Sequence, residues 1–194
     1  MARTVAAFKV DHFQFLDRDG KLVEGQQVPA LARDFDRLTQ LYRQMVLTRV
    51  FDKKAIALQR TGKLGTYASS LGHEAAQVAI GSAMQPEDCF APMYREYGVQ
   101  FCRGVKMTDV LLYWGGDERG NDYSGAPHDF AWCVPIATQC LHAAGAAMAF
   151  KLRNEKRVAV SVVGDGGSSK GDFLEAINAG SAWKLPLVLV IVNN

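Results

Sequence analysis

Apolar residues recur mostly at spacings of three and four along residues 34–60, as the buried face of an amphipathic helix requires. The residues that carry this pattern are Leu38, Leu41, Tyr42, Met45, Val46, Val50, Ile56 and Leu58. Thr61-Gly62 follows as a stop signal, because glycine readily adopts the left-handed conformation that closes a helix. The pattern therefore predicts one long helix over residues 34–60.

Three more segments have the pattern of helices. Residues 72–84 carry a face of small residues, largely alanine, that can pack closely against a neighbouring backbone. Residues 107–114 predict a short helix, and the alanine-rich residues 137–153 predict a longer one. The close-packing stripe of the longer helix is expected at Leu141, Gly145, Met148 and Leu152. Residues 115–129 are rich in Gly, Asp, Asn and Pro, so they predict a surface loop of the kind that often carries function.

The C-terminal part of the chain alternates between strand-like and helix-like patterns. A β-branched run at residues 158–163 is followed by a glycine-rich turn at 164–171, a helical pattern at 172–183 and a second apolar run at 187–192. This succession is a βαβ unit. Both runs are apolar on both faces, which is typical of parallel strands covered by helices. The sequence thus predicts an α/β fold with a parallel sheet flanked by helices.

The start of the chain lacks this regular alternation. Two short apolar runs, residues 13–16 and 22–23, are separated by a turn-like cluster at residues 17–21. They predict an N-terminal arm over residues 1–33 that can fold into a hairpin. Residues 34–194 then form one main domain, because single domains usually hold roughly 100–200 residues.

Composition narrows the class of protein. Hydrophobic residues make up 48% and charged residues 22% of the chain, with a net charge of +2, which is typical of a soluble globular protein and gives no reason to expect nucleic acid as a partner. No apolar segment approaches the roughly 20 residues that span a bilayer, and residues 1–15 lack a secretory signal pattern. The four cysteines form no CxxC pair. This argues against a zinc site and a disulfide scaffold, and it predicts reduced thiols in the cytoplasm.

Polar residues follow both strands of the βαβ unit. In α/β sheets ligands bind at the carboxyl ends of the strands, where residues 164–168 leave the first strand and Asn193 and Asn194 leave the second. Glycines let backbone N–H groups approach a phosphate, and Asp165 and Asn194 offer oxygen ligands of the kind that Mg²⁺ prefers. The residues predict a magnesium-diphosphate site. Taken separately, Asp165 could cap a helix and the Asn pair could form a turn.

Two other phosphate-binding motifs fit these residues less well. A P-loop requires lysine after its last glycine, whereas Lys170 precedes Gly171. A dinucleotide-binding fingerprint requires glycine or alanine at its sixth position and an acidic residue after the next strand, whereas Ser169 and Asn193-Asn194 occupy those places. A dinucleotide enzyme stays as a competing hypothesis, beside a non-catalytic scaffold that has kept only the fold.

Gly164-Asp165-Gly166, followed after a helix and a strand by Asn193-Asn194, resembles the thiamine-diphosphate motif. Other segments resemble more narrowly the alpha subunits of the E1 components of pyruvate and branched-chain 2-oxo acid dehydrogenase complexes. These segments are residues 60–65, 71–75, 94–96 and 164–173. The resemblance implies a thiamine-diphosphate-binding fold over residues 34–194, truncated after the Asn pair of the motif.

The resemblance also implies thiamine diphosphate and Mg²⁺ as cofactors, and it assigns residues to them. Asp165 and Asn194 are the implied magnesium ligands. The other implied cofactor-binding residues are Tyr94, Arg95, Val134, Ile136, Gly164, Gly166, Gly167 and Ser168. Val134 and Ile136 match positions whose backbone contacts the aminopyrimidine ring. Arg95 also suits its place physically, because a guanidinium bonds phosphate through two parallel hydrogen bonds.

Two further groups of residues match features of the family. Asp172 and Glu175 match carboxylates that line a proton channel between paired active sites, although a helix dipole explains two acidic residues in a first turn equally well. A monovalent-cation site found in some members is matched by Cys133, Pro135, Thr138 and Gln139. Cys133 replaces the usual hydroxyl there, so we do not predict potassium.

Histidines are candidates for acid–base chemistry, because imidazole titrates near neutrality. His128 lies in the glycine-rich loop, near where the family places an active-site loop, and it is a candidate. The resemblance places the key histidine of the family well after the Asn pair, so we assign no catalytic residue within residues 1–194. His73 sits beside Glu74 at the start of a helix, where a structural role is the better interpretation.

The activity implied by the resemblance is oxidative decarboxylation of a 2-oxo acid, with transfer of the acyl group to the lipoyl group of the E2 acyltransferase. Pyruvate is the favoured substrate, and the branched-chain acid 3-methyl-2-oxobutanoate is the alternative. The implied partner is an E1 beta subunit in an alpha2-beta2 heterotetramer, and that subunit carries the activating glutamate. Family alpha subunits are longer than 194 residues, so we expect a piece of such a subunit that is inactive by itself.

Overall fold

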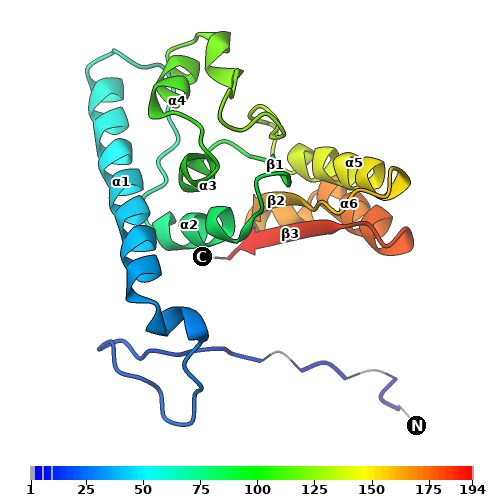
Figure 1. Ribbon diagram of the computed structural model, residues 1–194. Coiled ribbons are helices and arrows are strands. Elements are labelled where there is room, and N and C mark those ends of the chain that lie inside the picture. The colour runs from blue at the N-terminus through cyan, green and yellow to red at the C-terminus, as the bar shows by residue number, and fades with distance from the viewer. Residues whose placement is uncertain (1–2, 6, 10, 194) are drawn as a thin grey trace. The chain divides into compact units, whose positions relative to one another are not determined.

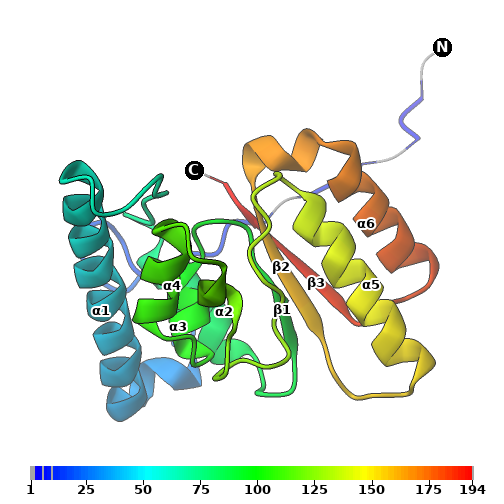
Figure 2. The same cartoon turned by 90° about the horizontal axis from the view of Figure 1, so that it is seen from above.

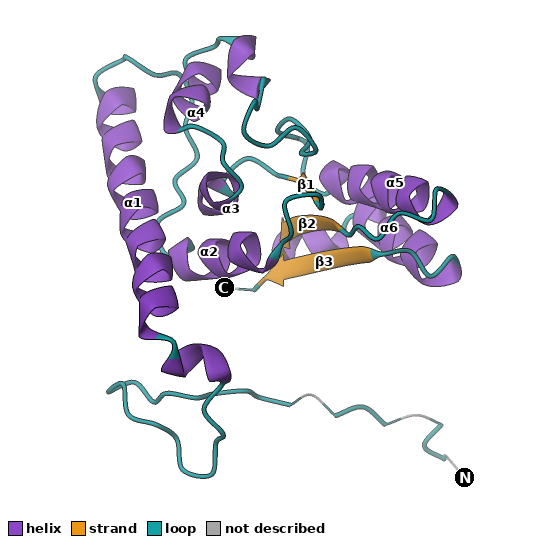
Figure 3. Ribbon diagram, in the orientation of Figure 1, coloured by secondary structure: helices purple, strands orange, loops and turns teal. Residues whose placement is uncertain are grey.

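The computed structural model describes residues 3–5, 7–9 and 11–193 (Figure 1). The chain divides into two units, residues 1–40 and 41–194. Most of the second unit is helical, and its strands lie side by side in a single small sheet (Figure 3).

The first unit contains little regular structure. One antiparallel bridge joins Leu16 to Leu22, and the carboxylate of Asp17 between them accepts hydrogen bonds from two backbone N–H groups of the turn, both at 2.9 Å. The hairpin predicted for this arm is therefore present as a single bridge. A 3₁₀ turn follows at Ala30–Arg33.

Helix α1 spans Phe35–Arg60, which confirms the long helix predicted for this segment. Its buried residues are Thr48, Phe51, Asp52 and Ala55. Three of the apolar residues that carried the pattern are exposed instead, namely Tyr42, Val46 and Val50. The expected buried face was therefore wrong in part, because two polar residues occupy it and each forms hydrogen bonds there.

Helices α2 (Glu74–Ala83) and α4 (Met107–Trp114) confirm two more predictions. Between them lies α3 (Tyr97–Cys102), which has six residues and is too short for a periodic pattern to reveal. The three helices and α1 surround an aromatic cluster in which Tyr97 stacks on Tyr67, with ring centroids 5.3 Å apart. This cluster is the core of the helical half of the second unit.

Residues 115–129 are not simply a surface loop. They include a 3₁₀ turn at Glu118–Asn121, and three of their residues are buried, namely Gly120, Tyr123 and Ala126. Gly120 lies so close to α4 that an added Cβ would stand 2.4 Å from the carbonyl oxygen of Asp109. The prediction of a surface loop was wrong for these positions, because Tyr123 and Ala126 join the aromatic core and Gly120 packs against α4.

The sheet contains three parallel strands in the order β1 (Cys89–Ala91), β2 (Ala159–Gly164) and β3 (Leu187–Val192). Strands β2 and β3 are joined through α6 (Gly171–Ala182), which confirms the predicted βαβ unit. Strand β1 has only three residues and was not anticipated. The α/β fold class with helices on a parallel sheet is confirmed.

Helices cover both faces of the sheet (Figure 2). On one face, α5 (Thr138–Leu152) and α6 pack against alternate residues of β1 and β2, including Ala159 and Val163. On the other face, residues of α2 and α3 pack against Val160 and Val162. The alternation follows from the two-residue period of a strand.

The packing face of α5 differs from the predicted stripe. Its buried residues are Gln139, Cys140, Ala143, Ala144, Ala147 and Phe150, whereas Leu141 and Leu152 are exposed. The small side chains of alanine let the helix approach the sheet closely, so alanine and not leucine marks the contact.

Strand β3 lies at the edge of the described sheet. Val188 and Ile191 are 46% and 48% exposed, so the expectation of two fully covered strands holds for β2 and not for β3. Among the residues that the structure describes, no helix is long and apolar enough to cross a membrane.

Candidate functional site

A pocket of about 260 Å³ opens at the carboxyl ends of the strands. Met93 and Tyr94 reach it from the segment after β1, Gly164 and Gly166 from the loop after β2, and Val192 from the end of β3. The other lining residues are His73, Arg95, Glu96, Ile136, Val162 and Gly167. This is the edge where parallel α/β sheets bind ligands.

The glycine-rich loop forms one wall of the pocket. It continues β2 as a short 3₁₀ turn, Asp165–Ser169. A Cβ atom added at Gly164 or Gly166 would meet nothing within 4 Å, so the backbone there faces open space. Gly167 is packed instead, because its added Cβ would stand 2.6 Å from a methyl carbon of Val163. The loop therefore offers bare backbone to a ligand, as a diphosphate requires.

The first predicted magnesium ligand, Asp165, is exposed directly after β2, and it is not among the lining residues of the pocket. In the register of the sheet Gly164 pairs with Val192, so Asp165 and Asn193 leave neighbouring strands at the same edge. Asn194, the second predicted ligand, lies outside the described residues. No cluster of three or more His, Cys, Asp or Glu side chains suited to a metal ion occurs among the described residues.

Ser168 is turned toward its own loop. Its hydroxyl donates a hydrogen bond to the carbonyl oxygen of Asp165 at 2.6 Å, and that of Ser169 donates to Gly166 at 2.9 Å. Ser168 is not among the lining residues. Its hydroxyl thus shapes the turn and leaves the lining of the pocket to the glycines.

The opposite wall is the segment that leaves β1. Tyr94, Arg95 and Glu96 all line the pocket, and the Arg95 guanidinium lies 5.2 Å from the centroid of the Tyr94 ring. The hydroxyl of Tyr97 lies 3.0 Å from the carbonyl oxygen of Tyr94 and 2.8 Å from that of Ala68. A cation and a phenol held by these backbone contacts suit a phosphate-bearing ligand.

Glu96 has an unusual environment for a carboxyl group. It is 3% exposed, and its Oε2 atom has no hydrogen-bond partner in the described part of the chain. Burial raises the pKa of this carboxyl to about 7, against an ordinary value of 4.5. The resemblance of residues 94–96 to the family assigned no role to Glu96, because only burial distinguishes it from an ordinary surface glutamate.

The segment before α5 contributes Ile136, whereas Val134 is half exposed and does not line the pocket. Ala137 follows with φ of 71°, an uncommon left-handed conformation for a residue with a Cβ. It is completely buried at the start of α5. This turn brings Ile136 over the glycine loop, where its Cγ2 atom would stand 2.9 Å from a Cβ added at Gly167.

The residues matched to a cation site lie together. The side-chain N–H of Gln139 donates to the carbonyl oxygen of Val162 at 2.8 Å, while its buried Oε1 atom has no partner among the described residues. The Cys133 sulfur lies 3.6 Å from the carbonyl oxygen of Pro135. Thr138 donates its hydroxyl proton to Asp172 at 2.9 Å, so this hydroxyl is already engaged.

The two histidines weighed as candidates lie in different places. His73 lines the pocket at the start of α2, although the sequence favoured a structural role. His128 is exposed and lies outside the lining. Its neighbour Asp129 is buried in an ion pair with Arg103, at 2.6 Å between Nε and Oδ2.

Asp172 is partly buried and Glu175 is exposed, so the proton-channel assignment stays a prediction.

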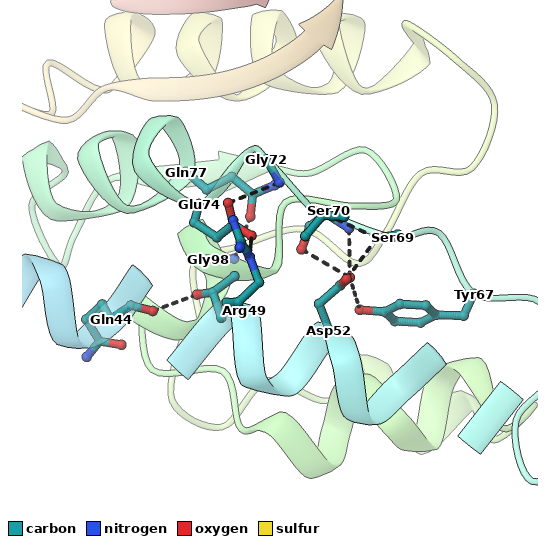
Figure 4. Close-up of polar contacts among 12 residues, drawn as sticks. Gln44, Arg49, Asp52, Tyr67, Ser69, Ser70, Gly72, Glu74, Gln77 and Gly98 are labelled. Carbon is teal, nitrogen blue, oxygen red and sulfur yellow. Dashed lines mark hydrogen bonds and ion pairs between the residues drawn. The ribbon is translucent and has the colours of Figure 1, made fainter. Parts of the chain in front are cut away.

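A polar network joins α1 to the loop that leads to His73 (Figure 4). The carboxylate of Asp52 accepts hydrogen bonds from the Tyr67 hydroxyl at 3.0 Å and from the Ser70 backbone N–H at 2.8 Å. One turn earlier, Arg49 forms an ion pair with Glu74, which lowers the pKa of that carboxyl to about 2. These bonds fix the entry to α2 at the rim of the pocket.

Comparison with known proteins gives the family. The family described as "Dehydrogenase E1 component" matches residues 42–194. The chain belongs to this family. It is 40% identical over 178 residues to the pyruvate dehydrogenase E1 component subunit alpha of Acholeplasma laidlawii, covering 92% of this chain and 51% of the relative.

Two staphylococcal relatives are similar to the same extent. The pyruvate dehydrogenase E1 component subunits alpha of Staphylococcus epidermidis and Staphylococcus aureus are 39% and 38% identical over 186 residues, which cover 96% of this chain and 50% of each relative. The chain thus spans about half the length of the curated relatives it matches. Membership in this family confirms the resemblance of the sequence to E1 alpha subunits, and it implies thiamine diphosphate as the cofactor.

Proposed function

We propose that the protein is an alpha-type E1 subunit that binds magnesium thiamine diphosphate in the pocket at the carboxyl ends of β1, β2 and β3. With an E1 beta subunit it would catalyse oxidative decarboxylation of pyruvate and transfer the acyl group to the lipoyl group of an E2 acyltransferase. The observation that carries this proposal is the pocket itself, whose lining includes both the bare glycine backbone at Gly164 and Gly166 and the basic residue Arg95. The names of the relatives support pyruvate as the substrate.

The residues of this chain would divide the work of holding the cofactor. Gly164 and Gly166 would present backbone N–H groups to the diphosphate, and Arg95 would neutralise part of its charge. Asp165 and Asn194 would supply the protein's share of the magnesium ligands, since Mg²⁺ takes the rest from phosphate and water. When bound, thiamine diphosphate supplies the nucleophilic carbon and the electron sink for decarboxylation.

The proposal also covers the partner subunits, the proton channel and the cellular location. An alpha2-beta2 heterotetramer would place the pocket at a subunit boundary, with Asp172 and Glu175 leading protons between two such sites. Residues 34–194 would form the thiamine-diphosphate-binding domain. Mg²⁺, the beta subunit, the lipoyl-bearing partner and a cytoplasmic location all belong to this proposal. A branched-chain 2-oxo acid is the alternative substrate, because a methylene or two changes selectivity by only about 1–3 kcal/mol.

Calorimetry with the full-length protein and its co-purifying subunits tests the cofactor site. Thiamine diphosphate should bind in the presence of Mg²⁺ and more weakly, by roughly tenfold or more, without it, since Asp165 and Asn194 would hold the metal and its charge would offset that of the diphosphate. Asp165→Ala should abolish the effect of the metal. Asp36→Ala is the matched control, because Asp36 is an exposed aspartate in the first turn of α1.

Three outcomes would argue against the proposal in different ways. Equal binding of thiamine diphosphate with and without Mg²⁺ would show that the site does not use the metal. Binding of a nicotinamide dinucleotide in place of thiamine diphosphate would favour the dinucleotide enzyme. No binding of either ligand would favour the non-catalytic scaffold.

A further inference from the structure

The side chain of Gln77 is held at both ends of its amide group (Figure 4). It projects from α2 and is 3% exposed. Its Nε2 atom donates a hydrogen bond to the carbonyl oxygen of Arg95 at 2.7 Å. Its Oε1 atom accepts one from the backbone N–H of Gly98 at 2.8 Å. One buried amide therefore binds the backbone on both sides of Glu96 and Tyr97.

The bond to Gly98 closes the start of α3. The first N–H groups of a helix have no partner within the helix, and side chains usually satisfy them. Glu96, which precedes α3, forms no such capping bond with its own side chain. Gln77 supplies the acceptor from a neighbouring helix instead. The position of the pocket segment is thus coupled to α2 and not to its own local sequence.

The packing around Gly98 leaves this coupling little freedom. A Cβ added at Gly98 would stand 2.9 Å from the Cβ of Gln77 and 3.3 Å from the hydroxyl oxygen of Thr48 on α1. Helix α2 is itself fixed one turn earlier, where Glu74 pairs with Arg49 of α1. Both α1 and α2 therefore define where the Arg95 backbone lies.

We propose that Gln77 is a positioning residue for the pocket, and that its bond to the Arg95 carbonyl holds the Arg95 guanidinium ready for a diphosphate group. This inference rests on the proposed function, which makes Arg95 a phosphate-binding residue. A backbone that is already fixed at Arg95 loses no further backbone entropy when the guanidinium binds, and it sets the position from which the side chain extends. Gln77 itself is not a lining residue, so it acts through Arg95.

Two substitutions separate the bonds of Gln77. Gln77→Met keeps the length of the side chain and removes both hydrogen bonds. Gln77→Glu keeps an acceptor for the Gly98 N–H and places an oxygen against the Arg95 carbonyl. Binding of inorganic pyrophosphate with Mg²⁺ is measured by calorimetry on the full-length protein with its co-purifying subunits. We expect both variants to bind pyrophosphate about five- to tenfold more weakly, the size of one lost hydrogen bond.

The matched control is Gln100→Met, which removes another buried amide, whose Nε2 atom donates to the Tyr123 hydroxyl and is not bonded to the pocket segment within the described residues. It should lower thermal stability by less than Gln77→Met, because it loses one hydrogen bond and not two, and leave the pyrophosphate affinity unchanged. In an Arg95→Ala background, Gln77→Met should cause no further loss, because residues that act as a unit are not additive. When the thiamine diphosphate concentration is varied, Gln77→Met should raise KM for the cofactor more than it lowers kcat.

The possible results distinguish this inference from the proposed function. Wild-type affinity in both Gln77 variants would overturn the positioning role, as would equal losses in Gln77→Met and Gln100→Met. A full additional loss in the Arg95→Ala background would also contradict it, because Gln77 would then act without Arg95. If Arg95→Ala and the unmodified protein bind pyrophosphate equally, the phosphate role of Arg95 in the proposed function fails as well.

Discussion

The two walls of the pocket are held in different ways. The glycine loop is stabilised by bonds within itself, since Ser168 and Ser169 each donate to a carbonyl three residues earlier. The segment after β1 is held from a distance, because Gln77 bonds to Arg95 from 18 positions away. Tyr97 reaches back 29 positions to the carbonyl of Ala68. One wall is a local structure, and the other is a product of the surrounding helices.

This difference explains why the walls should respond differently to mutation. A local turn depends on which residues are glycine, so its failures should be steric and confined to the loop. A wall held from a distance depends on buried polar groups, so its failures should change with pH and with substitutions elsewhere in the fold. The following experiments test that contrast, beginning with the largest expected effect.

Glu96→Gln should change the pH dependence of stability. The pKa of Glu96 is raised from 4.5 to about 7, so the folded state keeps a proton that the unfolded chain releases. The stability contributed by the protonated carboxyl is complete below pH 4.5 and is lost as pH rises through 7. Relative to wild type, the variant should gain about 3 kcal/mol between pH 4 and pH 8, measured by urea unfolding across this range. A difference that does not vary with pH would show that Glu96 is ionised in the folded protein.

Arg95→Ala should weaken pyrophosphate binding by about 10- to 100-fold, because hydrogen bonds to charged groups contribute roughly 1.5–3 kcal/mol. Arg95→Lys should recover only part of this loss, since lysine cannot form two parallel bonds. Both are measured by calorimetry with Mg²⁺ present. An Arg95→Lys variant with full affinity would argue for simple charge attraction and against a fixed guanidinium geometry.

Gly167→Ala should destabilise the loop wall by about 1–3 kcal/mol, because the new methyl group overpacks against Val163 and Ile136. The thermal midpoint should fall by roughly 2–4 °C for each kcal/mol lost. Gly164→Ala is the matched control: its methyl group meets nothing within 4 Å, so folding should be unaffected while the pocket narrows. Equal stability of the two variants would contradict the packing described for Gly167.

Tyr97→Phe should have the smallest effect, about 1 kcal/mol, because it removes one hydroxyl shared between the carbonyls of Tyr94 and Ala68 and keeps the aromatic packing. The loss should appear as a lower thermal midpoint together with weaker pyrophosphate binding. Tyr123→Phe is a suitable control, since Tyr123 is also buried in the aromatic cluster and does not line the pocket. Weaker binding in the control as well would assign the effect to the cluster and not to the Tyr94 carbonyl.

Most helices and the βαβ unit were predictable, because these segments are long enough for the pattern of apolar residues to be recognised. The faces were predicted less well: Asp52 is buried on α1 because Tyr67, Ser69 and Ser70 donate to it from another segment. Strand β1 and helix α3 were missed, since three and six residues carry too little pattern. The surface-loop prediction failed at Tyr123, whose burial depends on an aromatic core assembled from distant segments.

Some features of the candidate site could also be predicted from the sequence, and others could not. The glycine loop, Asp165 and Arg95 were predicted from motifs, and the structure places three of the glycines and Arg95 in the lining of one pocket. Their roles toward a diphosphate stay predictions. Neither the role of Gln77 nor the burial of Glu96 could be predicted from the sequence, because the residue type alone does not tell whether a glutamine or a glutamate is buried. Asn194 stays a prediction from the motif, outside the described residues.

The sequence by itself determined the longer helices, the βαβ unit with its parallel strands and the glycine loop at the carboxyl edge of those strands. These properties depend on local periodicity and on a motif whose members are joined by one βαβ unit. The tertiary structure alone decided which polar groups are buried, which face of α5 packs and how Arg95 is held. Those properties depend on contacts between residues far apart in the chain, where burial and hydrogen bonding are set by neighbours that no local pattern specifies.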